Sequence, residues 1–167
     1  MENFLQSLGQ NFVSKNGNNN GFSLKSAQLI GIYFSAHWCP PCRGFTPVLA
    51  EFYNKVNANG KVFEVVFASS DSDKETFDEY LSTMPWIALE FGSSVKEDLA
   101  DKFGVSGIPR LVILDNEGNL VQPNARGDVV QKGVNAFSHW TSLLVKKPVD
   151  DHKWAQITTN GLPIMAK

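Results

Sequence analysis

The chain has 167 residues, 43% of them hydrophobic and 19% charged, which is enough for one domain with a sizeable core. Its 15 basic and 17 acidic residues give a net charge of -2 without the basic excess that a phosphate backbone attracts, so we expect no nucleic-acid partner. No apolar stretch approaches the ~20 residues that span a bilayer. The longest is Leu29–Ala36, so we expect no membrane association.

The first 28 residues are interpreted as an N-terminal β-hairpin extension. The Asn- and Gly-rich run at residues 16–21 favours left-handed turns, and we place it at the hairpin tip. Short strands are predicted on either side, at Asn11–Lys15 and Phe22–Leu24. The start of the chain, Met1–Phe12, has neither the cationic residues nor the apolar run of a signal peptide. We therefore expect a cytoplasmic protein, with the nucleus as the alternative compartment.

Two apolar runs form the expected centre of the fold. Leu29–Ser35 and Val62–Ala68 are apolar on both faces, as is typical of central strands covered by helices on each side. Between them, apolar residues recur at helical spacing from Pro40 to about Val56. The first strand is therefore followed closely by a long amphipathic helix.

The second half of the chain alternates helices with strands. The predicted elements are a helix ending at Pro85, a helix ending at Gly104, a strand at Arg110–Asp115, a turn at residues 116–118, an edge strand beginning at Leu120 and a helix from Val130 to Leu144. This order predicts an α/β fold within residues 1–147, with a central mixed β-sheet flanked by helices on both faces. Residues 148–167 lack periodicity and are expected to form a surface tail.

The two cysteines of the chain, Cys39 and Cys42, lie at the start of the long helix. This position sets Cys39 against free amide groups and the positive end of the helix dipole, which favours the thiolate. Pro40 and Pro41 preset helical dihedrals but lack amide hydrogens, so the Cys42 amide is the expected donor to the Cys39 sulfur. Cys42, one turn further along, is the expected resolving thiol.

A structural disulfide and half of a zinc site are the alternatives for this pair. A structural zinc site takes four protein ligands, and the chain has no second pair of cysteines. His37 alone cannot complete the set, so we expect no metal. A lone Cys-x-x-Cys in a reducing compartment favours redox chemistry over a permanent cross-link.

The decapeptide Trp-Cys-Pro-Pro-Cys-Arg-Gly-Phe-Thr-Pro at residues 38–47 resembles the active-site segment of tryparedoxins and of nucleoredoxin thioredoxin-like domains. Further matches lie at Tyr33–Ala36, Phe63–Phe67, Met84–Leu89 and Phe103–Pro109, so the resemblance covers roughly residues 8–145. It implies a thioredoxin-like fold in which the proline that matches Pro109 is cis and lies against the dithiol. A strand-opening proline without a substrate role is the alternative.

The resemblance also implies where substrate binds. A cis-Pro109 would leave the Ile108 backbone free to pair with an extended substrate segment. Arg43 and Arg126 look like the tryparedoxin arginines that meet an anionic, glutathione-type substrate, with solvated surface charges as the alternative. Trp38 is expected to offer a flat contact beside the dithiol. The expected substrate-binding residues are Trp38, Pro40, Pro41, Arg43, Ile108, Pro109 and Arg126.

Three positions differ from thioredoxins or from tryparedoxins. Tyr33 stands where thioredoxins carry a buried acid, as it does in the tryparedoxin pattern, so a carboxylate at that position cannot handle protons. Ser70 stands where tryparedoxins tend to have tryptophan, and Arg110 replaces the usual threonine after the cis proline. The substrate of this chain therefore cannot be inferred directly from the substrates of these families.

These observations predict a thiol-disulfide oxidoreductase that reduces protein disulfides by Cys39 attack and Cys42 resolution. Expected partners are protein disulfides, peroxiredoxins among them, and a low-molecular-weight thiol or a reductase as electron donor. We expect a monomer without an organic cofactor, since the chain has neither a Gly-rich phosphate loop nor a Rossmann fingerprint. The alternative is a redox-gated protein-binding module of nucleoredoxin type in signalling.

Overall fold

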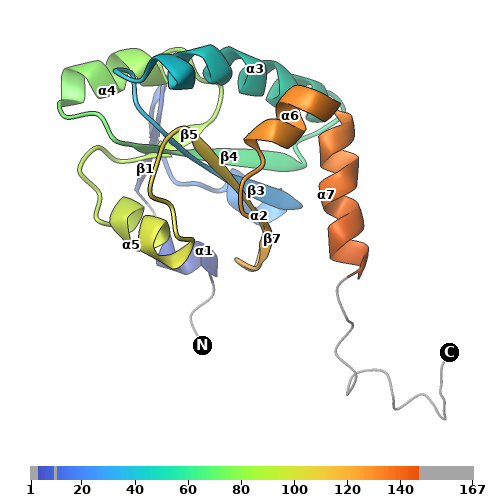
Figure 1. Ribbon diagram of the computed structural model, residues 1–167. Coiled ribbons are helices and arrows are strands. Elements are labelled where there is room, and N and C mark those ends of the chain that lie inside the picture. The colour runs from blue at the N-terminus through green and yellow to red at the C-terminus, as the bar shows by residue number, and fades with distance from the viewer. Residues whose placement is uncertain (1–3, 10, 147–167) are drawn as a thin grey trace, which may run out of the picture.

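The structure is a computed structural model that describes residues 4–9 and 11–146 (Figure 1). Its strands are β1 (Phe12–Ser14), β2 (Gly17–Asn19), β3 (Leu29–Ser35), β4 (Phe63–Ser69), β5 (Ile87–Leu89), β6 (Arg110–Asp115) and β7 (Leu120–Gln122). Within the described residues they form one mixed sheet in the order β2-β1-β5-β4-β3-β6-β7. The pairs β3–β4 and β4–β5 are parallel, whereas β6 is antiparallel to both β3 and β7.

Helices cover both faces of this sheet, as the sequence predicts. They are α1 (Phe4–Ser7), α2 (Ser23–Ser26), α3 (Pro40–Val56), α4 (Lys74–Leu81), α5 (Val95–Lys102), α6 (Arg126–Lys132) and α7 (Asn135–Lys146). The core on one face includes side chains of α3, α4, α6 and α7, and the core on the other includes those of α1, α2 and α5 (Figure 1). The α/β architecture expected from the element order is confirmed.

Strand β3 lies inside the sheet, between β4 and β6. Successive side chains of a strand point to opposite faces, so Tyr33 packs in the core beneath α3 while Ile32 and Phe34 pack in the core of the α5 face. Every residue of β3 is buried, and each large apolar side chain buried in this way stabilises the fold by about 1.5–3 kcal/mol. The C-terminal end of β3, from which the chain leads to the cysteines, is therefore rigidly held.

The N-terminal hairpin is present, but its second strand and its tip differ from the prediction. The tip lies at residues 15–16, so only the first residue of the Asn-rich run at residues 16–21 is in the turn, and residues 17–19 of the run form β2. The strand predicted at Phe22–Leu24 is wrong, because this segment leads into the short helix α2. The side chains of Asn19 and Asn20 accept hydrogen bonds from backbone amides two residues ahead, at 2.7 and 2.9 Å, which turns the chain out of the sheet.

The single last helix expected from Val130 to Leu144 is also wrong, because the segment forms two helices, α6 and α7. Gly133 adopts a positive φ of 56° and ends α6. The spacing that predicted one helix used Val130 and Val134, which are 61% and 46% exposed. The buried side chains of the two helices include Val129, Ala136 and Trp140, whose spacing of seven and four residues would also fit one helix, so the apolar pattern does not reveal the break at Gly133.

Two short elements, α1 and β5, were not predicted, because no pattern in the sequence distinguishes them from loops. β5 is three residues long, yet it joins the hairpin to the rest of the sheet, pairing with β1 on one side and β4 on the other. The tail expected at 148–167 lies outside the described residues. Within the part of the chain that the structure describes, no helix is both long and apolar enough to cross a membrane.

Candidate active site

The dithiol lies where the rigid end of β3 meets the first turn of α3. Cys39 occupies the N-cap position with extended backbone angles, and Pro40 and Pro41 fill the first two helical positions. The backbone amide of Cys42 donates to the Cys39 sulfur at 3.3 Å. The two cysteines are present as free thiols; Cys39 is 5% exposed and Cys42 is fully buried. The donor and the burial order predicted from the sequence are confirmed.

The residue before Pro109 packs against the cluster that contains the dithiol. The Ile108–Pro109 peptide bond is cis, as the resemblance implied. Ile108 packs against the small cluster formed by Ala36, Cys39 and Cys42, and it is itself only partly buried. An apolar side chain therefore packs against the cluster that contains the dithiol and remains partly open to solvent.

Trp38 forms the exposed wall beside Cys39. Its side chain is 59% exposed, yet its indole Nε1 donates to the Ser70 carbonyl at 3.0 Å. The backbone amide of Ser70 in turn donates to the Ser35 carbonyl at 2.9 Å. The ring is therefore held at one edge by the loop after β4 and leaves much of its surface open to solvent.

Four buried hydroxyl groups form a connected cluster behind Cys42. The Tyr33 hydroxyl lies 2.7 Å from Thr46 Oγ1, and the Tyr80 hydroxyl lies 2.6 Å from the same atom. Ser35 Oγ lies 2.7 Å from the Tyr80 hydroxyl. Thr46 Oγ1 donates to the Cys42 carbonyl at 2.9 Å, as an i+4 contact along α3. We call Tyr33, Ser35, Thr46 and Tyr80 the hydroxyl cluster.

The buried environment holds the proton on Cys42. Burial raises the pKa of the Cys42 thiol to about 11, with a hydrogen bond to the Cys39 sulfur acting in the same direction and a hydrogen bond to Ser35 opposing it. Burial also raises the pKa values of Tyr33 and Tyr80, so both phenols stay neutral in ordinary buffers. Of the two thiols, Cys42 is therefore held in its protonated form at neutral pH.

Comparison with known sequences identifies the family. The sequence model of the thioredoxin-like family matches residues 27–120, more than half of the chain and all of β3 to β6. The chain belongs to the thioredoxin-like family. This confirms the thioredoxin-like fold expected from the sequence.

Within this family, the chain is similar to nucleoredoxins and tryparedoxins. The chain is 46% identical over 141 residues to Probable nucleoredoxin 1 of Arabidopsis thaliana, an alignment that covers 82% of this chain and 24% of that protein. Tryparedoxin from Trypanosoma brucei has a TM-score of 0.71 at 42% identity, covering 78% of this chain and 91% of that one. Tryparedoxin II complexed with glutathionylspermidine has a TM-score of 0.67 at 38% identity, covering 74% and 87%. The chain spans about a quarter of the length of the nucleoredoxins it matches.

The three arginines of the chain have different neighbours. Arg43, exposed in the first turn of α3, lines a surface pocket of ≈ 300 Å³, which we call the α3–α4 pocket. The Arg126 guanidinium lies 6.0 Å from the centre of the Phe45 ring, a cation–π arrangement at the start of α6. Arg110 donates to the Pro123 carbonyl at 3.4 Å. The α3–α4 pocket is lined by His37, Arg43, Thr46, Pro47, Tyr80 and Thr83.

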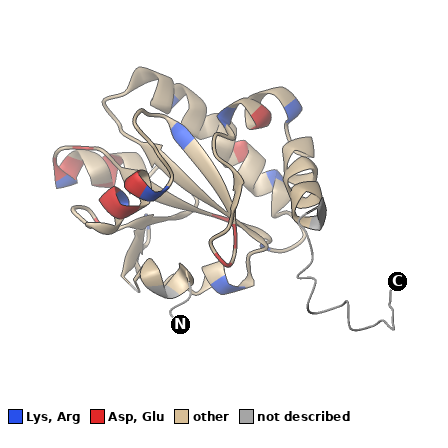
Figure 2. Cartoon of the chain, turned by 60° about the horizontal axis from the view of Figure 1, so that its bottom comes forward, with Lys and Arg blue, Asp and Glu red and all other residues tan. Residues whose placement is uncertain are grey.

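The surface around these arginines carries charges of both signs. Figure 2 shows the positions of Lys and Arg (blue) interspersed along the chain with those of Asp and Glu (red). Attraction of an anionic substrate would therefore depend on individual arginines near the dithiol rather than on a broad positive field.

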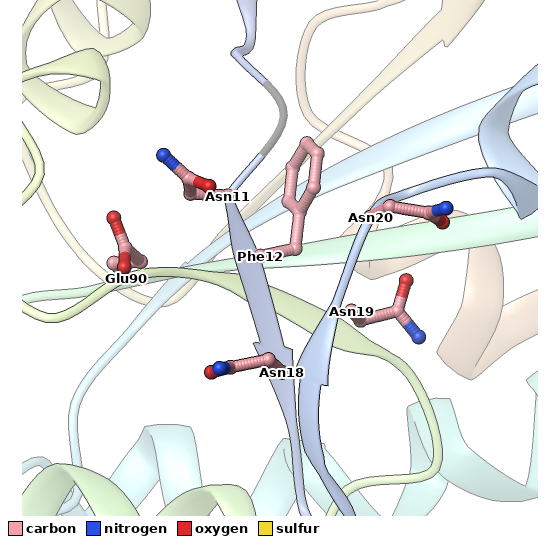
Figure 3. Close-up of a pocket in the computed structure, with 6 residues that line it drawn as sticks. All are labelled: Asn11, Phe12, Asn18, Asn19, Asn20 and Glu90. Carbon is pink, nitrogen blue, oxygen red and sulfur yellow. The ribbon is translucent and has the colours of Figure 1, made fainter.

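A larger pocket of ≈ 520 Å³ lies at the N-terminal hairpin and shares no lining residue with the dithiol site (Figure 3). Its walls are mainly asparagine side chains of β2 and of the residues just before β1 and just after β2. Two of them, Asn19 and Asn20, already use their carbonyl oxygens to turn the backbone toward α2. The pocket is lined by Asn11, Phe12, Asn18, Asn19, Asn20 and Glu90.

Sequence reasoning missed most of the hydroxyl cluster. Thr46 carried a signal, because it lies one helical turn after Cys42 and so faces the same side of α3. Ser35 and Tyr80 carried none, since 45 residues separate them in the chain. Only the packing of α4 beside α3 brings the Tyr80 hydroxyl to the back of the dithiol.

Proposed function

We propose that the protein is a dithiol-disulfide oxidoreductase that reduces protein disulfides. One observation carries the proposal: the Cys42 amide donates to the Cys39 sulfur at the N-terminus of α3 while the Cys42 thiol stays buried and protonated. Amide donors and the helix dipole favour a thiolate at Cys39. The pair thus has one sulfur suited to attack and one suited to resolution.

The reaction begins when the Cys39 thiolate attacks a substrate disulfide. A bond forms between Cys39 and one substrate sulfur, and the other substrate sulfur leaves as a thiolate. Cys42 then loses its proton and attacks Cys39, which releases the second substrate sulfur and forms the Cys39–Cys42 disulfide. Two electrons pass from the dithiol to the substrate, and a low-molecular-weight thiol or a reductase returns them in the next cycle.

The proposed substrate surface surrounds the slightly exposed Cys39 sulfur. Trp38 supplies an exposed aromatic face, and Ile108 supplies a partly open apolar contact against the cluster that contains the dithiol. Pro40 and Pro41 are exposed on the helix tip, and Pro109 follows Ile108 at the same edge. An extended segment on either side of a disulfide can lie across this surface.

Arg43 and Arg126 are proposed to meet carboxylates of a glutathione-type substrate or electron donor. Both side chains are exposed; Arg43 lies in the first turn of α3, next to Cys42, and Arg126 lies over the ring of Phe45 in the same helix. A related structure, tryparedoxin II, is a complex with glutathionylspermidine. Reduction of peroxiredoxins is part of the same proposal, set in the cytoplasm or the nucleus, where free thiols persist.

Turnover of insulin with dithiothreitol as electron donor tests the proposal. We expect the parent protein to reduce many equivalents of insulin, Cys39→Ser to reduce none, and Cys42→Ser to capture insulin chains covalently on Cys39. Binding of one equivalent without turnover would favour the redox-gated binding module instead. Insulin reduction by Cys39→Ser at the parent rate would show that Cys39 is not the nucleophile.

A further inference from the structure

The α3–α4 pocket adjoins the dithiol. Its lining residues belong to α3, α4 and the segments next to them, and the two helices cover the same face of the sheet (Figure 1). His37 precedes Cys39 by two residues, and Arg43 directly follows Cys42. The Arg43 backbone amide donates to the Cys39 carbonyl at 3.1 Å. The pocket therefore begins at the turn that carries both thiols, and the exchange reaction described above assigns it no role.

The inside of this pocket is mainly apolar. Its most buried lining residues, Thr46 and Tyr80, are 3% and 2% exposed. Their hydroxyl groups lie 2.6 Å apart, and Thr46 also donates to the Cys42 carbonyl. The hydroxyl of Thr83 donates to the Tyr80 carbonyl at 2.7 Å. Because each of these three hydroxyl groups already has a partner within the protein, the pocket favours an apolar group over a polar one.

Arg43 supplies a positive charge at the rim of the pocket. Its side chain is exposed, and within the described residues its guanidinium forms no hydrogen bond or ion pair. Among the described residues that line the pocket there is no Asp or Glu. The imidazole of His37 packs edge to face on the Tyr80 ring, with 5.5 Å between centroids. A guanidinium binds a carboxylate through two parallel hydrogen bonds, so the rim complements an acidic group.

The volume of the pocket suits a single side chain. Sites for small organic ligands range from about 300 to about 1,000 Å³. The α3–α4 pocket, with ≈ 300 Å³, lies at the lower end of this range. The proposed function brings a polypeptide to Cys39, and an extended chain advances by about 3.3 Å per residue. Side chains a few residues from the substrate cysteine are therefore the groups that can reach a pocket beginning at the same helical turn.

We propose that the α3–α4 pocket is a substrate subsite that takes a large apolar side chain of a disulfide-bearing protein segment, while Arg43 binds a neighbouring Asp or Glu of that segment. The inference deepens the proposed function and rests on it. The bonds made and broken at sulfur are those of the exchange reaction. The subsite adds a preference among protein substrates, because a segment that fills it is held beside Cys39 for longer.

Competition between synthetic peptides tests the subsite. Each peptide is a disulfide-linked homodimer with one cysteine per chain, and its versions differ only in one dipeptide, which is Phe-Glu, Ala-Glu, Phe-Gln or Ala-Gln. The dipeptide lies from about two to about five residues from the cysteine, with each spacing in a separate mixture. Cys42→Ser protein receives equal amounts of all versions at about pH 8, above the range in which a free imidazole titrates. Mass spectrometry then shows which peptide is bound to Cys39.

The capture by Cys42→Ser should show two separable preferences. At the best spacing we expect Phe peptides to be captured about fivefold to twentyfold more often than their Ala counterparts, because the pocket removes apolar surface from water. Glu peptides should be captured about twofold to fivefold more often than their Gln counterparts, since Arg43 is exposed and exposed ion pairs are weak. In about 0.5 M salt the Glu preference should fall, whereas the Phe preference should persist.

A second substitution in the Cys42→Ser protein assigns each preference to its residue. Arg43→Gln should abolish the Glu preference and keep the Phe preference. Thr83→Trp, which places a large ring at the exposed rim, should abolish the Phe preference. Its matched control is Thr83→Ser, which keeps the hydroxyl that donates to the Tyr80 carbonyl. The control for Arg43→Gln is Lys55→Gln, which removes a positive charge from the last turn of the same helix. Both controls should keep both preferences.

Other results would contradict the proposal. Equal capture of all versions at every spacing would show that no subsite recognises these side chains. A Phe preference that persists in Thr83→Trp would place the apolar contact elsewhere, as on Trp38, and a Glu preference that persists in Arg43→Gln would assign it to another cation.

Two further outcomes separate the subsite from the reaction itself. If Thr83→Trp keeps the Phe preference but no longer captures oxidised glutathione, the occupant is a small thiol compound and the proposed protein segment is wrong. Absence of capture of every peptide by Cys42→Ser would instead overturn the proposed function, and the subsite with it.

Discussion

Asp71 Oδ1 accepts a hydrogen bond from the backbone amide of His37, 2.8 Å away, and so joins the loops that follow β4 and β3. The other oxygen of this nearly buried carboxylate accepts from the Ser69 hydroxyl at 2.9 Å. Because β3 and β4 are parallel neighbours, their C-terminal ends meet at one edge of the sheet. Asp71 thereby fixes the short segment that carries Trp38 and Cys39.

Replacement of this carboxylate should slow the exchange reaction. We expect Asp71→Ala to lower the rate of insulin reduction by about threefold to tenfold, since loss of a buried hydrogen bond costs about 1 kcal/mol and frees the segment before Cys39. Asp71→Asn keeps an acceptor and should stay within about twofold of the parent. Asp73→Ala, which removes only the N-cap of α4, should lower stability without changing the rate. A parent rate in Asp71→Ala would contradict the assigned role.

The raised pKa of Cys42 predicts selective alkylation of the dithiol. With iodoacetamide at pH 7, we expect mass spectrometry to find the label on Cys39 and Cys42 unmodified. In Cys39→Ser, the labelling rate of Cys42 should rise as the pH increases toward 11, because the buried thiol keeps its proton below its raised pKa. Labelling of Cys42 at pH 7 as fast as that of free cysteine would show that its proton is not held.

Gly21 at the end of the hairpin should tolerate no side chain. Its φ is +72°, and a Cβ there would overlap the Phe12 ring. We expect Gly21→Ala to lower the free energy of unfolding by about 2 kcal/mol or more, as measured by urea denaturation. Gly17→Ala is the control, because its φ of +117° is also strained but nothing lies within 4 Å of the added atom. Equal losses in both variants would argue against the close approach of Phe12.

The buried carboxylate of Glu64 should make its hydroxyl partners important for stability. It accepts hydrogen bonds from Tyr53 at 2.8 Å, from the Ser23 hydroxyl and from the Val65 amide at 3.0 Å. We expect Tyr53→Phe to lower the free energy of unfolding by about 1–3 kcal/mol, because a buried charge loses a donor. Lys61→Met removes a partly exposed ion pair of 3.5 Å and should cost less than about 1 kcal/mol. The reverse order in urea denaturation would contradict this account.

Elements that depend on contacts between residues close together in the sequence could be predicted from the sequence alone. The run of apolar residues predicted β3, and the helical spacing of apolar residues predicted α3. Because the helix follows the strand directly, Cys39 was predicted to lie at a helix N-terminus. The amide of Cys42 as the donor to Cys39 followed from the two prolines between them. Where local rules competed, the prediction failed: the asparagines at residues 18–20 lie in or next to a strand because β1 offers a pairing edge.

What the sequence by itself determined is the location of the proposed reaction centre, because the proposed nucleophile, the proposed resolving thiol and the helix that carries both occupy eighteen consecutive residues, from Cys39 to Val56. Only the tertiary structure decided what surrounds that centre. Asp71 comes from the loop after β4, Tyr80 from α4 and Ile108 from the segment before β6, and no local pattern relates these residues to the cysteines. Their contacts depend on sheet order and helix packing, which arise from apolar burial summed over the whole chain.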